Sequence, residues 1–448
     1  MTNTAALARP AIEKQTIRKL QLRLIPFLLT LFMFNVLDRN NIGFAALTMN
    51  SELGISSSQY GLLAGMFFFG YFTFEIPSNL LLHKLGARIW IARILITWGL
   101  VASLTGFAHN LTQLDIARFM LGVAEAGFFP GIVLYLTYWF PERERARTVA
   151  MFMTGLPIML MIGAPLSGWV LDNVHWMGLS SWRWLLMLEG IPAFTCGILT
   201  YFVLPDYPEK AKFLTAEEKE WLHAELERER KEKQAKHQMT VLQTLFSPRV
   251  WYLTAIYFAF LCDYYCINFW MPLEVKSLSS HYSNTTIGFL VMIPNVLGLV
   301  AMVLVSYSSD RLLERRWHAA GAVIVGGIAM TLLPTTNNPI LSILLLSVVT
   351  MGIYSFFGPF WTLPPEFLTG AAAASGIALV NSVANFGGFV GPYTLGIITQ
   401  KTGSVAYGMA IMSVALFLTA ALVLLLPVLG FTQPRQKELQ TEQLSAER

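Results

Sequence analysis

The sequence predicts an all-α, polytopic membrane protein with twelve membrane-spanning helices. Of its 448 residues, 55% are hydrophobic and 13% are charged, whereas a soluble domain carries about 25% charged residues. The shortfall comes from apolar stretches that recur along the chain, each close to the ~20 residues that a helix needs to cross a bilayer. The predicted spans are 22–47, 58–82, 89–108, 112–138, 148–172, 184–204, 250–273, 285–307, 317–334, 339–362, 372–398 and 405–430.

The basic residues predict how these spans are oriented. Arg183, Lys276 and Lys401 lie in loops on one side of the predicted membrane, and Arg39 and Arg118 lie within it. The rest of the 31 Lys and Arg residues lie on the opposite side, which is cytoplasmic by the positive-inside rule. We therefore expect a multi-pass protein of the plasma (inner) membrane with both termini in the cytoplasm.

The polar segments divide the chain. We expect an N-terminal six-helix half at 1–204, a cytoplasmic linker at 205–249, a C-terminal six-helix half at 250–432 and a disordered tail at 433–448. Within the linker, TAEEKEWLHAELERERKEKQ reads as an amphipathic helix with a thin apolar stripe. Thr215 and Glu218 fit a capping box at its start.

The two halves read as repeats. HKLGAR at 83–88 precedes the third span, and SDRLLERR at 309–316 precedes the ninth. GAPLSG at 163–168 in the fifth span is echoed by GPYTLG at 391–396 in the eleventh. Six spans plus six with echoed motifs indicate a parallel repeat about an axis along the membrane normal, with a substrate site at the repeat interface near the midplane.

The fourth span carries two charges inside an apolar stretch. Arg118 and Glu125 are seven residues apart, so on a helix they share a face and lie about 10 Å apart along the axis. A charge in hydrocarbon costs at least about 2.5–3.5 kcal/mol, so this face must meet protein or a water-filled cavity. An Arg and a Glu there favour anion binding and proton movement; the alternative is a structural intramembrane salt bridge.

Several motifs, taken in order, resemble the major facilitator superfamily and, within it, the anion:cation symporter family and its bacterial tartrate-type transporters. Among them are LDRNNIGFA at 37–45, RFMLGVAEAGFFPGI at 118–132, SDRLLERRWH at 309–318 and GPFWTLPPEFLTGAAAASGIALVNSVANFGGFVGP at 358–392. The resemblance implies two pseudo-symmetric halves that alternate access. It also implies proton-driven uptake of an organic anion such as tartrate, a sugar acid or an aromatic carboxylate.

One part of the sequence departs from the superfamily pattern. In the superfamily, the first loop motif usually has an acidic residue at the position of His83 and Gly at the position of Asn79. In this chain, the second copy of the motif keeps Asp310 and Arg311. An electrostatic latch at the first loop would therefore be altered.

Four residues are the main site candidates: Asp38, Arg39, Arg118 and Glu125. The resemblance associates the matching positions with coupling and substrate recognition, and it places the first and fourth helices side by side. Asp38 then lies between Arg118 and Glu125 in height, at about 15 Å from the outer end of its span against about 9 and 20 Å. Arg118 suits carboxylate binding because its charge is permanent and its donors are forked. Asp38 and Glu125 suit proton carriage, since burial makes a carboxylate easier to protonate near neutral pH. Arg39 points about 100° away from Asp38 and either binds substrate or braces the bundle.

Three polar residues are further substrate-binding candidates. Tyr71 in the second span matches a binding tyrosine in the family pattern, with aromatic packing as the alternative. Asn381 and Asn385 lie one turn apart in the eleventh span and suit a polyhydroxy acid, with interhelical hydrogen bonding as the alternative.

Other functional classes are not supported by the sequence. The phosphate-loop pattern GxxxxGK[ST] and Ser-His-Asp or zinc constellations are absent from it, so we expect no enzyme activity, cofactor or metal. Cys196, Cys262 and Cys266 lie in apolar runs and form no disulfide framework. A net charge of +4 does not suggest nucleic-acid binding.

We therefore expect a monomeric carrier in the lipid bilayer whose partners are a small organic anion and a proton. Anion exchange, facilitated diffusion and a transporter-like membrane sensor remain as alternatives. Paired titratable carboxylates favour a carrier over a sensor.

Overall fold

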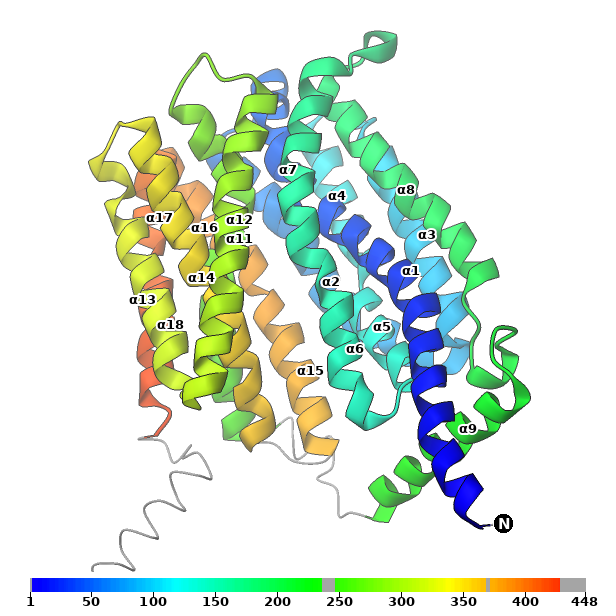
Figure 1. The fold of residues 1–448 in the computed structure, drawn as a ribbon. Helices are drawn as coiled ribbons and strands as arrows, with labels where there is room; N and C mark the ends of the chain where they lie inside the picture. The colour runs from blue at the N-terminus through cyan, green and yellow to red at the C-terminus, as the bar shows by residue number, and fades with distance from the viewer. Residues whose placement is uncertain (1, 236–245, 368–370, 428–448) are drawn as a thin grey trace, which may run out of the picture. The chain divides into compact units, whose positions relative to one another are not determined.

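The computed structural model describes residues 2–235, 246–367 and 371–427, and in these ranges the regular secondary structure is helical, with no strand (Figure 1). The first nine helices are α1 (Thr2–Leu53), α2 (Ser57–Leu85), α3 (Ala87–Thr105), α4 (Leu111–Glu125), α5 (Phe128–Thr137), α6 (Glu142–Met153), α7 (Gly155–Asn173), α8 (Ser181–Val203) and α9 (Ala216–Ala235). They are followed by α11 (Pro248–Ser277), α12 (Asn284–Leu312), α13 (Arg316–Leu332), α14 (Pro339–Phe367), α15 (Ala371–Asn385), α16 (Gly387–Thr402), α17 (Val405–Met412) and α18 (Val414–Leu425). Three short 3₁₀ turns lie at Trp176–Gly178, Pro208–Lys210 and Leu333–Thr335. The tail predicted at 433–448 lies outside the described residues.

The predicted spans coincide with these helices. In the described ranges, ten helical stretches are long and apolar enough to cross a membrane. The other two predicted spans are occupied by α2 and by the consecutive helices α15 and α16. The all-α polytopic fold class is therefore confirmed.

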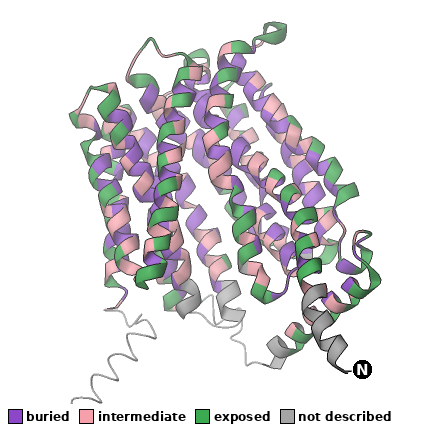
Figure 2. Ribbon diagram, in the orientation of Figure 1, coloured by how far each residue is buried: buried purple, intermediate pink, exposed green. Residues whose placement is uncertain are grey.

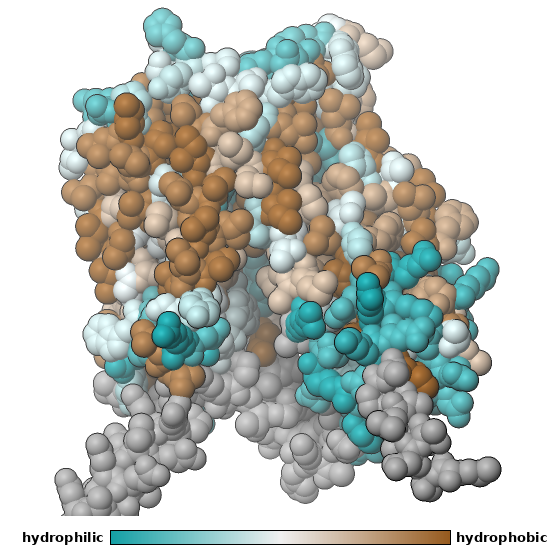
Figure 3. Space-filling view, viewed as in Figure 1, coloured by the Kyte–Doolittle hydropathy of each residue, from teal (hydrophilic) through white to brown (hydrophobic). Residues whose placement is uncertain are grey.

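Apolar side chains cover the outward faces of the helices. Buried residues follow the faces where helices pack together, and exposed residues follow the opposite faces (Figure 2). Hydrophobic residues gather over the middle of the helices and polar ones at the ends (Figure 3). Val303, Leu304 and Ile328 are at least half exposed in the structure. Apolar surface on this scale is the face that lipid covers.

The helices form two compact units. Unit 1 comprises Met1–Ile55, Met66–His237 and Ser283–Gly288, and unit 2 comprises Ser56–Gly65, Gln238–Tyr282 and Phe289–Arg448. Each unit thus contains most of one sequence half and a short segment of the other. The linker helix α9 belongs to unit 1.

The fourth span is not the continuous helix that its apolar run predicted. Gly127 adopts a left-handed conformation, with φ of 87°, and separates α4 from α5. Ser78 Oγ from α2 donates a hydrogen bond of 2.6 Å to the carbonyl of Ala126, which satisfies a backbone acceptor at the break. A Cβ at Gly127 would lie 2.4 Å from this hydroxyl. The break places Glu125 at the last residue of α4.

The predicted linker helix and its capping box are confirmed in unit 1. The amide of Thr215 donates to Glu218 Oε2 at 2.9 Å, and the amide of Glu218 donates to Thr215 Oγ1 at 3.3 Å. Lys19 Nζ from α1 lies 2.7 Å from Glu218 Oε1. Arg143 at the start of α6 forms ion pairs with Glu13 and Glu225. Helix α9 is therefore fastened to the polar ends of α1 and α6.

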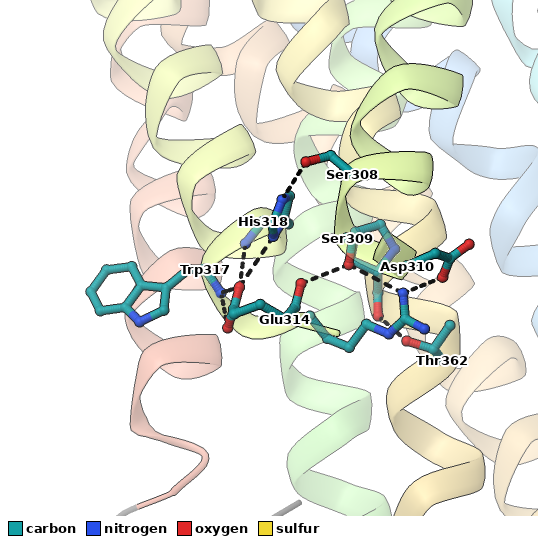
Figure 4. Close-up of polar contacts among 9 residues, drawn as sticks. Ser308, Ser309, Asp310, Glu314, Trp317, His318 and Thr362 are labelled. Atoms are coloured by element: carbon teal, nitrogen blue, oxygen red, sulfur yellow. Dashed lines mark hydrogen bonds and ion pairs between the residues drawn. The ribbon is translucent and has the colours of Figure 1, made fainter. Parts of the chain in front are cut away.

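In unit 2, the second loop motif is stabilised by its own side chains (Figure 4). Arg315 pairs with Asp310, and Ser309 Oγ donates to the carbonyl of Glu314 at 2.7 Å. The Glu314 carboxylate accepts from the amide of Trp317 at 2.8 Å and so caps α13. These contacts within the motif stabilise the turn between α12 and α13.

Candidate functional site

Close contact between α2 and α4 positions the site in unit 1. Gly122 on α4 lies between Arg118 and Glu125 in sequence, and a Cβ there would lie 2.0 Å from the carbonyl oxygen of Phe67 on α2. A Cβ at Gly70 on α2 would likewise lie 2.2 Å from the carbonyl oxygen of Phe119 on α4. Because both positions lack a side chain, the two backbones touch here.

Arg39 and Glu125 form an ion pair between α1 and α4. Arg39 Nη2 donates to Glu125 Oε1, and Glu125 is completely buried. The structure therefore directs Arg39, which the sequence left between two roles, toward the carboxylate of the fourth span. An ion pair at this depth can be opened by a competing anion, because a ligand carboxylate offers the guanidinium equivalent oxygens.

Asp38 lies in the same region and is completely buried. Trp98 Nε1 from α3 donates to Asp38 Oδ2, and Asn41 Nδ2 donates to Asp38 Oδ1 at 3.0 Å. Asp38 also interacts electrostatically with both Glu125 and Arg118. The four charged candidates therefore lie near one another within unit 1.

Two aromatic rings of α2 face the guanidinium groups. The Arg39 guanidinium carbon lies 5.0 Å from the ring centroid of Phe67 and 5.2 Å from that of Tyr71. The Arg118 guanidinium carbon lies 5.4 Å from the Phe67 centroid. Arginine over a ring face gains cation–π attraction of about 0.5–2 kcal/mol. Tyr71 therefore contacts the arginine-lined region, together with Phe67, which the sequence did not single out.

Asn381 and Asn385 lie on α15 in unit 2. Asn385 Oδ1 accepts a hydrogen bond of 2.9 Å from the hydroxyl of Tyr265 on α11. Asn385 Nδ2 donates to the backbone carbonyl of Asn381 at 2.9 Å. Asn385 is thus held by interhelical hydrogen bonding, the alternative stated for it, while its role in binding substrate stays a prediction.

Trp98 and Asn41, like Phe67, were missed as site residues. Asn41 follows Asp38 by three residues, which is one helical turn, so its proximity was available from spacing. Trp98 gave no comparable signal, because tryptophan is common in membrane helices and its role depends on which face of α3 meets α1.

Within the described ranges, no cluster of three or more His, Cys, Asp or Glu side chains could hold a metal ion. Cys196, Cys262 and Cys266 are buried free thiols. The chemistry of the site is therefore that of two arginines, two carboxylates and the aromatic and amide groups around them.

Comparison with known proteins gives a family. Residues 28–392 match the model of the Major Facilitator Superfamily. A putative tartrate transporter of Agrobacterium vitis is 42% identical over 431 residues, which cover 96% of this chain and 94% of that protein. A quinolone resistance transporter of Acinetobacter baumannii is 40% identical over 404 residues, covering 90% of this chain and 93% of that protein.

A solved structure has the same fold. The crystal structure of a bacterial homologue of the human lysosomal transporter Spinster has a TM-score of 0.73 at 15% sequence identity, covering 90% of this chain and 95% of that chain. The family match, the transporter-named relatives and the all-helical polytopic fold agree, and the chain belongs to the Major Facilitator Superfamily of membrane transporters.

Proposed function

We propose that this protein is a proton-coupled symporter that takes up an organic anion, such as tartrate, a sugar acid or an aromatic carboxylate. The observation that carries the proposal is the ion pair between Arg39 and the buried Glu125, with Asp38 and Arg118 beside it. Two permanent cations suit a carboxylate ligand, and two buried carboxylates suit a proton. The relative named for tartrate supports the substrate class.

The ion pair couples the two ligands. A substrate carboxylate that binds Arg39 and Arg118 competes with Glu125 for the Arg39 guanidinium. The released Glu125 is a buried carboxylate without its cation, and such a group takes up a proton readily. Anion binding and proton binding therefore favour each other. After both ligands leave on the cytoplasmic side, Glu125 pairs with Arg39 again and the empty carrier returns.

Uptake by proteoliposomes tests the proposal. The panel is L-tartrate, D-gluconate, benzoate and, because one relative is named for quinolone resistance, a quinolone. We expect accumulation of an organic acid that requires an inward proton gradient. Accumulation driven only by an internal anion would indicate exchange, and equilibration without accumulation would indicate facilitated diffusion. Binding without flux would indicate a sensor.

Two variants test the coupling residues. Glu125→Gln mimics the protonated carboxyl, so it should retain substrate counterflow while losing accumulation driven by the proton gradient. Asp38→Asn should also lose driven accumulation, and it should disturb binding more because Trp98 and Asn41 lose an ionised partner. If both variants still use protons to accumulate substrate, neither carboxylate is the coupling group.

A further inference from the structure

A third buried carboxyl group, Glu189 on α8, lies beside Asp38. Glu189 is 4% exposed and Asp38 is fully buried, and the two groups interact electrostatically. Ser167 Oγ from α7 donates to Glu189 Oε1 at 2.8 Å. The described residues contain no ion pair to Glu189, and its Oε2 has no hydrogen-bond partner among them. The proposed coupling by Asp38 and Glu125 gives Glu189 no role.

Asn41 connects the two carboxyl groups. Its Nδ2 donates to Asp38 Oδ1 at 3.0 Å, and its side chain also interacts with the carboxyl group of Glu189. Asn41 Oδ1, like Glu189 Oε2, is buried and without a partner among the described residues. Buried acceptors that lack a donor are costly. A proton on Glu189 supplies the missing donor.

The surroundings decide which carboxyl group stays ionised. Asp38 accepts hydrogen bonds from Trp98 and Asn41 and interacts with the cation of Arg118. Glu189 accepts a hydrogen bond from the Ser167 hydroxyl and interacts with Asn41. Helix α3 presents Trp98 to the pair and, within the described ranges, no ionisable group that interacts with Glu189. Two adjacent buried carboxyl groups do not both ionise at low cost, so the negative charge belongs on Asp38.

We propose that Glu189 is the internal proton donor of Asp38, the neutral member of a buried carboxyl pair bridged by Asn41. When a substrate carboxylate engages Arg118, Asp38 loses the attraction of that cation. The O–H bond of Glu189 then breaks and an O–H bond forms on Asp38, which moves the negative charge to Glu189. Solvent later returns a proton to Glu189. The donor role depends on the proposed proton coupling, whereas the protonation of the pair does not.

Infrared spectroscopy of the purified full-length protein, without substrate, tests the pair directly. At pH 7 the wild type should show the carbonyl stretch of a protonated carboxylic acid that Glu189→Gln lacks. In Asp38→Asn, where the neighbouring charge is gone, the same band should titrate at lower pH. Identical wild-type and Glu189→Gln spectra, or a band whose titration ignores Asp38→Asn, would overturn the proposal. If Glu189→Gln fails to fold, Ser167→Ala replaces it: loss of the donor to the ionised form must move the titration to higher pH.

Transport then tests the donor role, with L-tartrate as probe. Glu189→Gln should bind L-tartrate as the wild type does but take it up about tenfold or more slowly at neutral external pH, as expected when a positioned proton donor is removed. Acidic external pH should restore the rate, because solvent then protonates Asp38 directly. A uniform loss at every pH would mean a structural role. If the wild type does not transport L-tartrate, the infrared result still decides whether Glu189 is protonated beside Asp38. Only the proposed transport function is then affected.

Discussion

At the scale of single residues, the two intramembrane arginines have different surroundings. Arg39 is partly exposed and paired with Glu125, while Arg118 is 1% exposed and faces the ring of Phe67. A guanidinium over a ring presents its edge, where its forked donors lie, to a ligand. In the proposed mechanism, Arg118 would orient a planar carboxylate, and Arg39 would release Glu125 when that carboxylate binds.

Replacing Arg118 by lysine should weaken substrate binding. Arg118→Lys keeps the charge but loses the forked donors, and a charge-assisted hydrogen bond contributes about 1.5–3 kcal/mol, so Kd should rise roughly 10–100-fold. Equilibrium binding of the transported acid measures it. The matched control is Arg183→Lys, at a buried arginine that donates to the backbone carbonyl of Gly106 at 3.0 Å; it should change stability and leave Kd unchanged. Wild-type affinity in Arg118→Lys would remove Arg118 from the site.

At the scale of elements, glycine contacts set the distance between α2 and α4. Gly122→Ala would place a Cβ 2.0 Å from the Phe67 carbonyl, so the helices must separate, at a cost of about 1–3 kcal/mol. Thermal unfolding in detergent should show a lower Tm and, because Arg118 and Glu125 flank Gly122, weaker binding. Gly321→Ala in α13 is the control: nothing lies within 4 Å of its Cβ, and Ala there should be neutral or slightly stabilising. Equal effects of the two substitutions would contradict the packing argument.

The linker helix should undock in acid. Burial opposes ionisation of Glu218, but hydrogen bonds from Lys19 and Thr215 outweigh it and lower the pKa of Glu218 below 4.5. A lowered folded-state pKa means that the docked state is favoured above pH 4.5 and loses this contribution as pH falls through the folded value. Limited proteolysis within α9 should therefore accelerate at low pH. Glu218→Gln should show that faster cleavage already at pH 7, and pH-independent protection in this variant would refute the role of the ion pair.

At the scale of the whole molecule, the basic residues predict the topology. A reporter fused to the C-terminus should be found in the cytoplasm, and a cysteine introduced at residue 279 should react with an impermeant reagent from outside. The hydrophobic residues over the middle of the helices are compatible with either orientation. A C-terminus on the outside would reverse the inferred direction of uptake.

The sequence predicted the membrane spans for a physical reason that also makes the charged site candidates stand out. A helix must be about 20 apolar residues long to cross the hydrocarbon core, so the spans can be located from the sequence. A charge inside a span is costly, so the few charged residues there stand out: Asp38, Arg39, Arg118 and Glu125. The helix break at Gly127 was not predictable in the same way, because an apolar run has the same composition whether or not its backbone hydrogen bonds continue.

The sequence also did not predict which side chains contact the charged candidates. The Trp98 bond to Asp38 and the Phe67 contacts with both arginines depend on which helix faces meet. The contact between α2 and α4 that decides this depends on Gly70 and Gly122, and glycines are frequent throughout membrane helices. Packing at this level follows from three-dimensional contacts and not from periodicity.

The Arg39–Glu125 pair has an electrical consequence. In the proposed resting state, Arg39 and Arg118 are positive, Glu125 and Asp38 are negative and Glu189 is neutral, so the formal charges of these five groups cancel. Moving one net charge through the membrane field changes the free energy by about 2.3 kcal/mol per 100 mV, and an empty site whose formal charges cancel is spared that term. Under the proposed symport, the return step of the empty carrier should therefore not depend on membrane voltage. Any current recorded during uptake would then come from protons carried in excess of the negative charges on the substrate.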